Sequence, residues 1–148
     1  MAEIGEALRR HERVGIDTSV FIYHLEAKAP YGPLVRTIFK ALANGSFQGV
    51  TSALTFMELV VKPLQLDRPD IADEYEVLVA SYPNLTVAEL DRPTMRRAAE
   101  LRAAYRLSPP DALQVAACVE HGASAFLTND GGLRRLQHIE VLFLDDFV

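Results

Sequence analysis

Four carboxylates stand out in this sequence because each lies in a stretch that is otherwise almost free of charge. Asp17 is the only charged residue between positions 14 and 22, and Glu58 is the only one between positions 50 and 61. Asp111 opens a long apolar stretch, and Asp130 follows another. A lone carboxylate in apolar surroundings is costly unless it is paired or bound to a metal ion. Clusters of oxygen ligands select Mg²⁺ or Mn²⁺, and these ions suit phosphoryl-group chemistry.

Each of these carboxylates also has a purely structural explanation. Asp17 can cap the helix that follows it, and Glu58 completes a capping-box pattern that begins at Thr55. Asp111 completes a similar pattern, and Asp130 stands in an Asn-Asp-Gly-Gly turn. Taken singly, Asp111 and Asp130 favour the structural explanation, Glu58 favours function, and Asp17 stays open between the two. The joint pattern of all four is what indicates a site.

Short apolar segments alternate with longer amphipathic ones, as strands alternate with helices in α/β proteins. The predicted strands are 14–16, 48–51, 85–87, 125–127 and 141–144. The predicted helices are 3–12, 31–43, 53–61, 71–81, 91–106 and 108–122, with Pro63 and Pro83 expected to stop two of them. We expect a single domain over residues 1–148, a three-layer α/β/α sandwich with a mostly parallel five-stranded sheet. Residues 1–13 form an N-terminal extension that is expected to be helical.

The expected fold determines where the four carboxylates lie, because α/β sheets bind ligands beyond the carboxyl ends of their strands. Asp17 and Asp130 each follow a strand, and Glu58 lies early in the helix after the second strand. Asp111 begins a helix that precedes a strand, so we expect it at the opposite edge unless the two prolines before it carry it over the top. If all four converge, they cannot all be ionised without a cation.

The composition is that of a globular protein, with 49% hydrophobic and 24% charged residues in 148. A formal charge of −5 argues against a simple RNA-coating protein. The single cysteine excludes an intrachain disulfide and a cysteine-based zinc site. There is no apolar run of the ~20 residues that a membrane span needs, and the first residues lack the layout of a signal peptide. We therefore expect a cytoplasmic protein without a membrane partner.

Four segments of the chain, in order, resemble the motifs of the PIN domain, and specifically those of VapC-type toxins of toxin–antitoxin pairs. The segments are 17–23, 55–59, 110–117 and 127–133, and each contains one of the four carboxylates. The resemblance extends from residue 14 to the C-terminus and implies a PIN-like fold. It implies that all four carboxylates converge on one catalytic site for Mg²⁺, for which Mn²⁺ can substitute: Asp17, Glu58, Asp111 and Asp130.

The resemblance also implies an activity and partners. The activity is that of an endoribonuclease, which hydrolyses RNA phosphodiester bonds and leaves a 5′-phosphate and a 3′-hydroxyl. Thr128 matches a hydroxyl residue that supports the carboxylates by hydrogen bonding, and Ser19 and Asn129 are weaker candidates for the same role. The implied partners are an RNA substrate, a VapB-type antitoxin and a second copy of the chain in a homodimer.

Other functions remain to be weighed against a toxin. A housekeeping RNA-processing nuclease with the same domain is one alternative, and a non-catalytic RNA- or protein-binding relative is another. A phosphoacceptor signalling domain is disfavoured because no acidic pair precedes the second strand, and Lys62 is the last lysine. A haloacid-dehalogenase-type phosphatase is disfavoured because Asp17 is not part of an Asp-x-Asp motif.

Two groups of arginines are candidates for binding RNA. The first group falls on one side of helix 91–106 and consists of Arg92, Arg96, Arg102 and Arg106. The second group follows Asp130 and consists of Arg134 and Arg135. The helix face is either an ordinary solvated surface or a path for phosphates, and both interpretations stay open. Because no aromatic residues are interleaved with basic ones, the sequence gives little support for base stacking.

Overall fold

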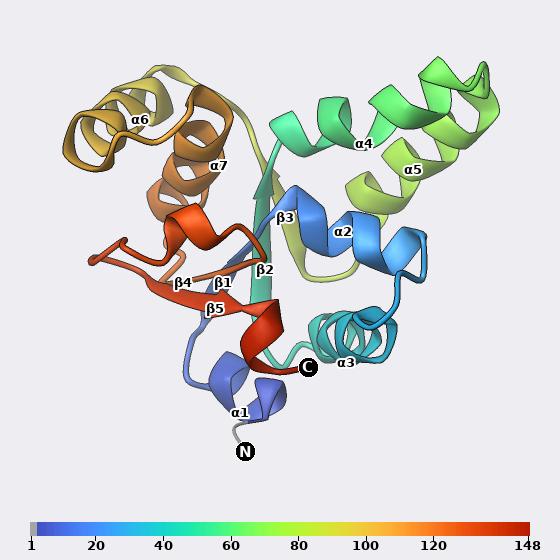
Figure 1. The fold of residues 1–148 in the computed structure, drawn as a ribbon, viewed down its shortest axis with the longest axis horizontal. Helices are drawn as coiled ribbons and strands as arrows, with labels where there is room; N and C mark the ends of the chain where they lie inside the picture. Colours follow the sequence, from blue (N-terminus) through green and yellow to red (C-terminus); the bar gives the residue numbers. More distant parts are fainter. Residues whose placement is uncertain (1–2) are drawn as a thin grey trace.

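The computed structural model describes residues 3–148, in which five strands form one sheet (Figure 1). The strands are β1 (Arg13–Ile16), β2 (Gln48–Ser52), β3 (Leu85–Ala88), β4 (Ala125–Thr128) and β5 (Glu140–Phe143). Their order is β3-β2-β1-β4-β5, and every neighbouring pair is parallel. The five predicted strands are confirmed to within one residue at each end. Chain order reverses between β1 and β4, which is where such sheets bind ligands.

Seven α-helices and two short 3₁₀ turns make up the rest of the regular structure between residues 3 and 148. The helices are α1 (Ile4–Arg9), α2 (Thr18–Leu25), α3 (Gly32–Ala43), α4 (Leu54–Gln65), α5 (Pro69–Ser81), α6 (Arg92–Tyr105) and α7 (Pro109–Glu120). The 3₁₀ turns are η1 (Gly131–Leu133) and η2 (Leu144–Asp146). In this described part of the chain, no helix has the length and apolar character needed to cross a membrane.

The helices cover both faces of the sheet, as the three-layer prediction requires. Helices α6 and α7 lie on one side, whereas α2 and α3 lie on the other with the α4–α5 hairpin beside them (Figure 1). Each face has its own buried cluster, represented by Val20, Phe39 and Leu42 on one side and by Val115 and Phe126 on the other. The predicted α/β/α sandwich is therefore confirmed.

Two predicted helix ends are wrong. Helix α1 ends at Arg9, and Glu12 lies just before β1, where its carbonyl accepts a hydrogen bond from the Gln48 backbone N–H at 2.8 Å. Helix α4 runs past Pro63, which was expected to stop it. A proline inside a helix removes one backbone hydrogen bond. Here Leu59 and Pro63 are buried, so packing against the core offsets that loss.

The N-terminal extension is fastened to the sheet at the amino ends of the strands. Its apolar residues, of which Leu8 is fully buried, join the core. Beyond α1, the His11 ring lies between two partners, with Nδ1 2.7 Å from Ser124 Oγ and Nε2 3.1 Å from Glu140 Oε2. Arg10 also pairs with Glu140, at 3.1 Å. The extension therefore packs as part of the domain.

Gly15 in β1 allows α7 to approach the sheet very closely. A Cβ atom added at this position would lie 2.8 Å from Cys118 Cβ and 2.7 Å from a ring carbon of Phe126. Both neighbours are fully buried and hold the space between α7 and β4. Because neither side can move without shifting the backbone of α7, this position accepts no side chain.

We predict that Gly15→Ala lowers the free energy of unfolding by about 1–3 kcal/mol, because it overpacks a filled core. Urea unfolding followed by circular dichroism measures the change. Gly131→Ala is the matched control, since a Cβ at Gly131 meets nothing within 4 Å. Equal stabilities of the two variants would contradict the close approach of α7.

Candidate acidic active site

The four carboxylates line one open pocket of about 520 Å³ at the carboxyl edge of the sheet. Asp17 directly follows β1 and is the N-cap of α2, and Asp130 follows β4 and is the N-cap of η1. Glu58 lies in the second turn of α4, which follows β2. Three acids therefore reach the pocket because parallel strands end at the same edge.

Asp111 lines the same pocket. Its place before a strand favours the opposite edge of the sheet unless the two prolines carry it over the top, whereas the family resemblance implies convergence. Helix α7 leads into a parallel strand, so it runs antiparallel to that strand, and its first turn lies at the carboxyl edge. Its far end lies at the amino edge, where Gly122 is beside the Arg13 side chain. Asp111 sits in the first turn of α7, where Ser108 Oγ accepts a hydrogen bond from its backbone N–H at 3.4 Å.

Asp17 is the most enclosed of the four carboxylates. Its Oδ1 accepts a hydrogen bond from the Thr18 backbone N–H at 2.8 Å, and its Oδ2 accepts one from Thr128 Oγ1 at 2.7 Å. Burial is the main cause that raises the pKa of Asp17 to about 6. The two hydrogen bonds oppose this shift, and the negative charges of Asp111 and Glu58 add to it. An acid in this environment gains from a nearby positive charge.

The carboxyl groups of Asp111 and Asp130 are in direct contact with each other. The pKa of Asp111 is raised by burial, then by the charge of Asp130 and by a hydrogen bond that the two carboxyl groups share. Asp130 is held in place by the Gly132 backbone N–H, which donates to its Oδ1 at 2.9 Å. Two carboxyl groups this close need a shared proton or a cation between them.

Glu58 is held from below by a buried network of hydroxyl and amide groups. Thr18 Oγ1 donates to Glu58 Oε1 at 2.6 Å and lies 3.1 Å from Thr55 Oγ1. Gln114 Nε2 donates to Thr55 Oγ1 at 2.9 Å, and the Ser52 hydroxyl donates to Gln114 Oε1. The Thr18, Thr55, Ser52 and Gln114 side chains are almost wholly buried, and their hydrogen bonds offset the free-energy cost of removing these polar groups from water.

The network corrects one interpretation and adds residues that the sequence analysis missed. Thr55 does not cap α4, whose N-cap is Ala53 without a side-chain hydrogen bond. Gln114, Thr18 and Thr55 orient Glu58 instead. The available signal was Gln114 itself, the one polar residue in the apolar stretch 112–119 of α7, where its side chain is only 2% exposed.

The three residues expected to support the carboxylates are placed differently from one another. Thr128 Oγ1 donates to Asp17 and accepts from the Asp130 backbone N–H at 3.0 Å, so it joins two of the acids. Ser19 Oγ lines the pocket region but is buried without a hydrogen-bond partner among the described residues. Asn129 also lines the pocket, yet its amide donates to the hydroxyls of Tyr23 and Tyr31.

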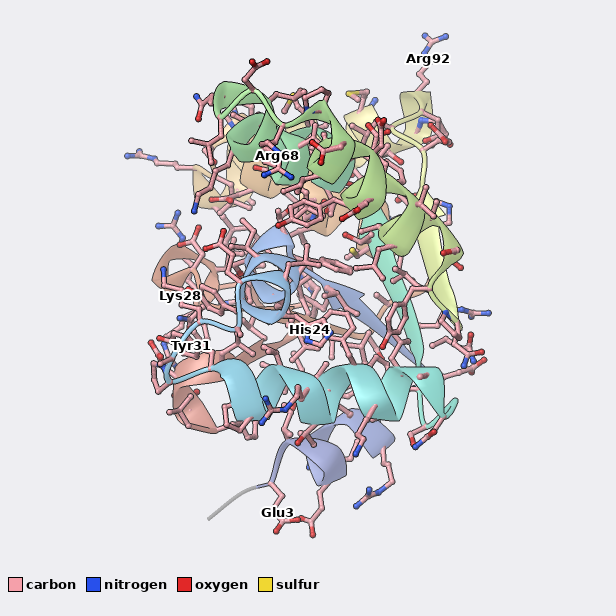
Figure 2. The ribbon with its side chains drawn as sticks, turned by 90° about the vertical axis from the view of Figure 1, so that its right-hand side faces the viewer. Glu3, His24, Lys28, Tyr31, Arg68 and Arg92 are labelled. Carbon is pink, nitrogen blue, oxygen red and sulfur yellow. The ribbon has the colours of Figure 1, made fainter. Side chains whose placement is uncertain are left out.

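The candidate RNA-binding arginines lie outside the pocket lining. Those of α6 are exposed, and Arg92 extends away from the body of the protein (Figure 2). Arg96 pairs with Glu100 at 3.7 Å. Arg106 follows the end of α6 in a left-handed conformation, so the helical spacing that grouped it with the others does not apply to it. The Arg134 guanidinium is paired with Asp146 at 2.9 Å and stacks over the Phe143 ring.

The donor chemistry of the pocket fits a hard divalent cation. Four carboxylates, two of them in contact, surround one opening, and the buried Ser19 hydroxyl beside them has no partner in residues 3–148. Oxygen ligands of this kind are those that Mg²⁺ prefers. Within those same residues, however, no three His, Cys, Asp or Glu side chains are arranged to hold one ion. Holding one ion with three of these carboxylates therefore requires some of their side chains to reorient.

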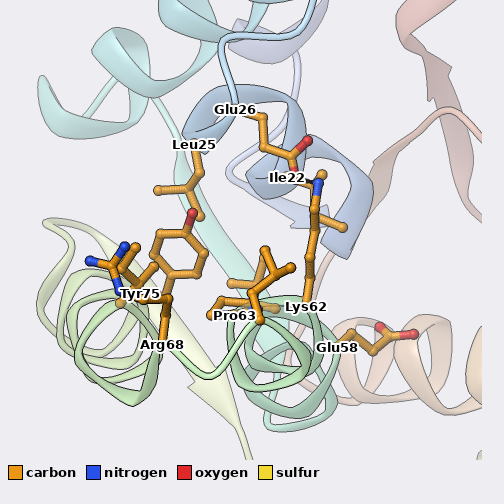
Figure 3. A pocket seen from close by; sticks show the side chains of 11 residues that line it. Ile22, Leu25, Glu26, Glu58, Lys62, Pro63, Arg68 and Tyr75 are labelled. Carbon is orange, nitrogen blue, oxygen red and sulfur yellow. Dashed lines mark hydrogen bonds and ion pairs between the residues drawn. The ribbon is translucent and has the colours of Figure 1, made fainter.

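A second pocket, more apolar, lies beside the acidic one. It is formed between α2 and the α4–α5 hairpin, with Ile22 and Leu25 on one side and Pro63 and Tyr75 on the other (Figure 3). Glu58 lines both pockets, so an occupant of the apolar pocket lies next to the carboxylates.

A parallel α/β/α sheet with carboxylates at its switch point places the protein among α/β proteins that carry an acidic site at the ends of their strands. The family is defined by the sequence. The family model for the PIN domain matches residues 14–139, so the chain belongs to the PIN domain family. No curated protein sequence matches the chain.

Several solved structures have the same fold. The Rickettsia felis VapBC2 complex bound to promoter DNA includes a chain that is 13% identical, with a TM-score of 0.70, covering 88% of this chain and 98% of that one. A chain of DNA-bound VapBC from Salmonella typhimurium is 18% identical with a TM-score of 0.69, and the match covers 89% of this chain and 98% of that one. Mycobacterium tuberculosis VapC20, a sarcin-ricin-loop-cleaving toxin, is 14% identical with a TM-score of 0.65, and the match covers 86% of this chain and 98% of that one. At these identities the likeness establishes the fold.

We predict that the metal-free protein loses stability as the pH rises from about 4 to about 6. In this window Asp17 is protonated in the folded state but ionised in the unfolded state, because its folded pKa is raised to about 6. The folded state therefore binds more protons, and the penalty is complete above the folded pKa. Asp17→Asn removes this contribution and raises the free energy of unfolding at pH 7 by up to about 3 kcal/mol.

Urea unfolding at a series of pH values in the presence of a chelator measures this effect. The difference between wild type and Asp17→Asn isolates Asp17 from other acids that titrate in the same window. Asp73→Asn, at an exposed position outside the pocket, serves as the control and leaves the slope unchanged. If the two proteins showed the same dependence of the free energy of unfolding on pH, the pKa of Asp17 would not be raised by burial in the folded state.

Proposed function

We propose that the protein is a Mg²⁺-dependent endoribonuclease that acts as the toxin of a VapBC-type toxin–antitoxin pair. The observation that carries this proposal is the pocket in which four carboxylates meet, with Asp111 in contact with Asp130 and with the pKa of Asp17 raised to about 6. A site this crowded with acids is suited to a divalent cation, and such cations serve phosphoryl-group chemistry.

The four carboxylates have different parts in this proposal. Asp17 and Asp111 are the principal ligands, since both are buried enough for their pKa values to be raised. Glu58 and Asp130 act directly or through water. When bound, Mg²⁺ supplies Lewis acidity toward the phosphate and acidifies a water molecule. Mn²⁺ has similar ligand preferences and is expected to substitute.

The chain itself contributes orientation and proton handling. Thr18 Oγ1 holds one oxygen of Glu58, whereas the Thr18 backbone N–H and Thr128 Oγ1 hold the two oxygens of Asp17. These donors fix the orientation of two carboxylates that line the pocket. In the proposed hydrolysis, a water oxygen bonds to phosphorus while the bond from phosphorus to the 3′ oxygen breaks. The water proton passes to a pocket carboxylate or to solvent, and the departing 3′ oxygen takes up a proton from solvent. The products therefore carry a 5′-phosphate and a 3′-hydroxyl.

The assignment as a toxin is supported by the fold and by the motifs. The solved structures with this fold include VapBC complexes and VapC20, which is described as a sarcin-ricin-loop-cleaving toxin. A housekeeping PIN-domain nuclease would share the same pocket, so the genetic context decides between the two. The exposed arginines on α6 and Arg135 belong to the proposal as contacts for RNA phosphates.

A VapB-type antitoxin has a suitable surface to bind on this chain. The apolar pocket between α2 and the α4–α5 hairpin accepts apolar side chains, and Glu58 connects it to the acidic pocket. An arginine or lysine of the antitoxin placed among the carboxylates would supply the positive charge that they need. Inhibition then follows from occupying the cation site.

A homodimer belongs to the same proposal. Three apolar side chains of α4 are exposed at helical spacing, Met57, Val61 and Leu64, with exposures of 57%, 45% and 52%. Val77 on the neighbouring helix α5 is 65% exposed. An apolar face of this kind on a soluble domain is suited to a second copy of the chain. Its position on α4 would bring the two acidic pockets toward one another.

We predict that Asp111→Asn lowers metal-dependent RNA cleavage by at least about 100-fold, because the substitution removes a charged ligand. Purified protein is incubated with single-stranded RNA and Mg²⁺ or Mn²⁺, and the product ends are mapped. Calorimetric titration with Mg²⁺ gives a second readout that is independent of RNA. Asp73→Asn is the control and retains activity. Cleavage by Asp111→Asn at the wild-type rate, or cleavage unaffected by EDTA, would refute the mechanism.

We predict that expression of the wild-type chain arrests growth in a bacterial host and that Asp17→Asn does not. Co-expression of the small protein encoded beside this gene should restore growth and form a stable complex on co-purification. The physical reason is that the partner occupies the acidic pocket. Growth arrest without relief by any adjacent small gene would favour a housekeeping nuclease over a toxin.

A further inference from the structure

Two tyrosines are stacked beside the acidic pocket, although they are eight residues apart in the chain. Tyr23 lies in α2 and Tyr31 precedes α3, and their ring centroids are 4.4 Å apart at an interplanar angle of 10°. Tyr23 also lines the acidic pocket itself. The fold therefore places a flat aromatic surface next to the carboxylates.

Hydrogen bonds fix the position of this pair relative to the carboxylates. The Asn129 amide nitrogen donates to the Tyr31 hydroxyl at 3.0 Å and to the Tyr23 hydroxyl at 3.4 Å. The Tyr31 hydroxyl in turn donates to Asp145 Oδ1 at 2.5 Å. Because Asn129 immediately precedes Asp130, the pair is tied to the backbone that carries one of the four acids.

The surroundings of the pair are those of a binding surface as well as of a packing contact. Both rings are only partly buried against the core. Lys28 Nζ lies 5.4 Å from the Tyr23 ring centroid and is near Tyr31 at the same edge of the protein (Figure 2). Between residues 3 and 148, no other aromatic ring or cation is stacked on Tyr31.

We propose that the stacked Tyr23 and Tyr31 rings form a platform on which a nucleobase of the RNA stacks next to the scissile phosphate. The inference rests on the proposed ribonuclease function and deepens it, since it assigns positioning residues for the substrate. Stacking on an aromatic side chain accepts any base and adds to affinity without touching the reacting atoms. Lys28 supplies a positive charge for an adjoining phosphate. The rigid hydroxyl contacts keep the platform ready before RNA arrives.

The test pairs ring-deleting and ring-preserving variants with RNA that lacks single bases. Tyr31→Leu removes the ring, and Tyr31→Phe keeps the ring but removes the hydroxyl. Each protein is assayed on a single-stranded oligonucleotide with one cleavage site and on versions with an abasic nucleotide at each position around that site. In wild type, we expect one abasic position to raise KM about 10-fold with kcat within about twofold, as loss of one stacked base would.

The combination of protein and RNA changes separates stacking from a structural role. Tyr31→Leu should raise KM for intact RNA about 10-fold, and the abasic position should then cause no further increase. Tyr31→Phe keeps the ring but loses the hydroxyl contacts, so it should raise KM less than Tyr31→Leu does and should retain the wild-type abasic effect. If no abasic position changes KM in wild type, or if the abasic effect persists in Tyr31→Leu, the platform is refuted while the ribonuclease function stands. If wild type cleaves no RNA at all, both are refuted.

Discussion

The gathering of four carboxylates in one partly enclosed pocket, where they lose solvent and repel one another, is the constraint on which the rest of this structure depends. Two unit charges a few ångströms apart cost about 4 kcal/mol at the effective dielectric of a protein surface, and four acids here share one pocket. The fold meets this cost with donors that are fixed in advance: Thr18 and Thr128 hydroxyls and the backbone N–H groups of Thr18 and Gly132. These donors stabilise the acids but do not neutralise them, so the need for a cation remains.

The topology explains why the acids meet at all. Strands β1 and β4 are neighbours in the sheet but far apart in the chain, so the residues that follow them, Asp17 and Asp130, come together at the switch point. Helix α7 brings Asp111 to the same edge because it runs antiparallel to β4. The polar network around Gln114 then links α7 to β2 and α4 beneath the pocket. Each carboxylate thus comes from a different element, and no short segment could form the site alone.

The sequence predicted the strands well because short apolar runs leave few alternatives when both faces of a sheet are covered. The sequence predicted the wrong end for helix α4, because the expectation that Pro63 stops a helix takes no account of the tertiary packing that buries Leu59 and Pro63. For Asp111 the local pattern favoured the opposite edge, and only the family resemblance placed it with the other acids, because the position of a helix start depends on the direction in which the helix runs past the sheet. The pairing of Tyr23 with Tyr31 and the network below Glu58 depend on side chains that meet only in three dimensions. Patterns along the chain carry no direct sign of them.

The close approach at Gly15 has a consequence for catalysis as well as for packing. Cys118, which contacts Gly15, and Asp111 lie on the same rigid helix, seven residues or about 10 Å apart. A tilt of about 5° about that contact moves the acidic end of α7 by about 1 Å, and misplacement of this size is enough to cost an enzyme about two orders of magnitude in rate. The packing at Gly15 therefore helps to set the position of the Asp111 carboxylate at the other end of α7. Variation in the core at this point is transmitted to the geometry of the pocket, even though Gly15 never touches a substrate.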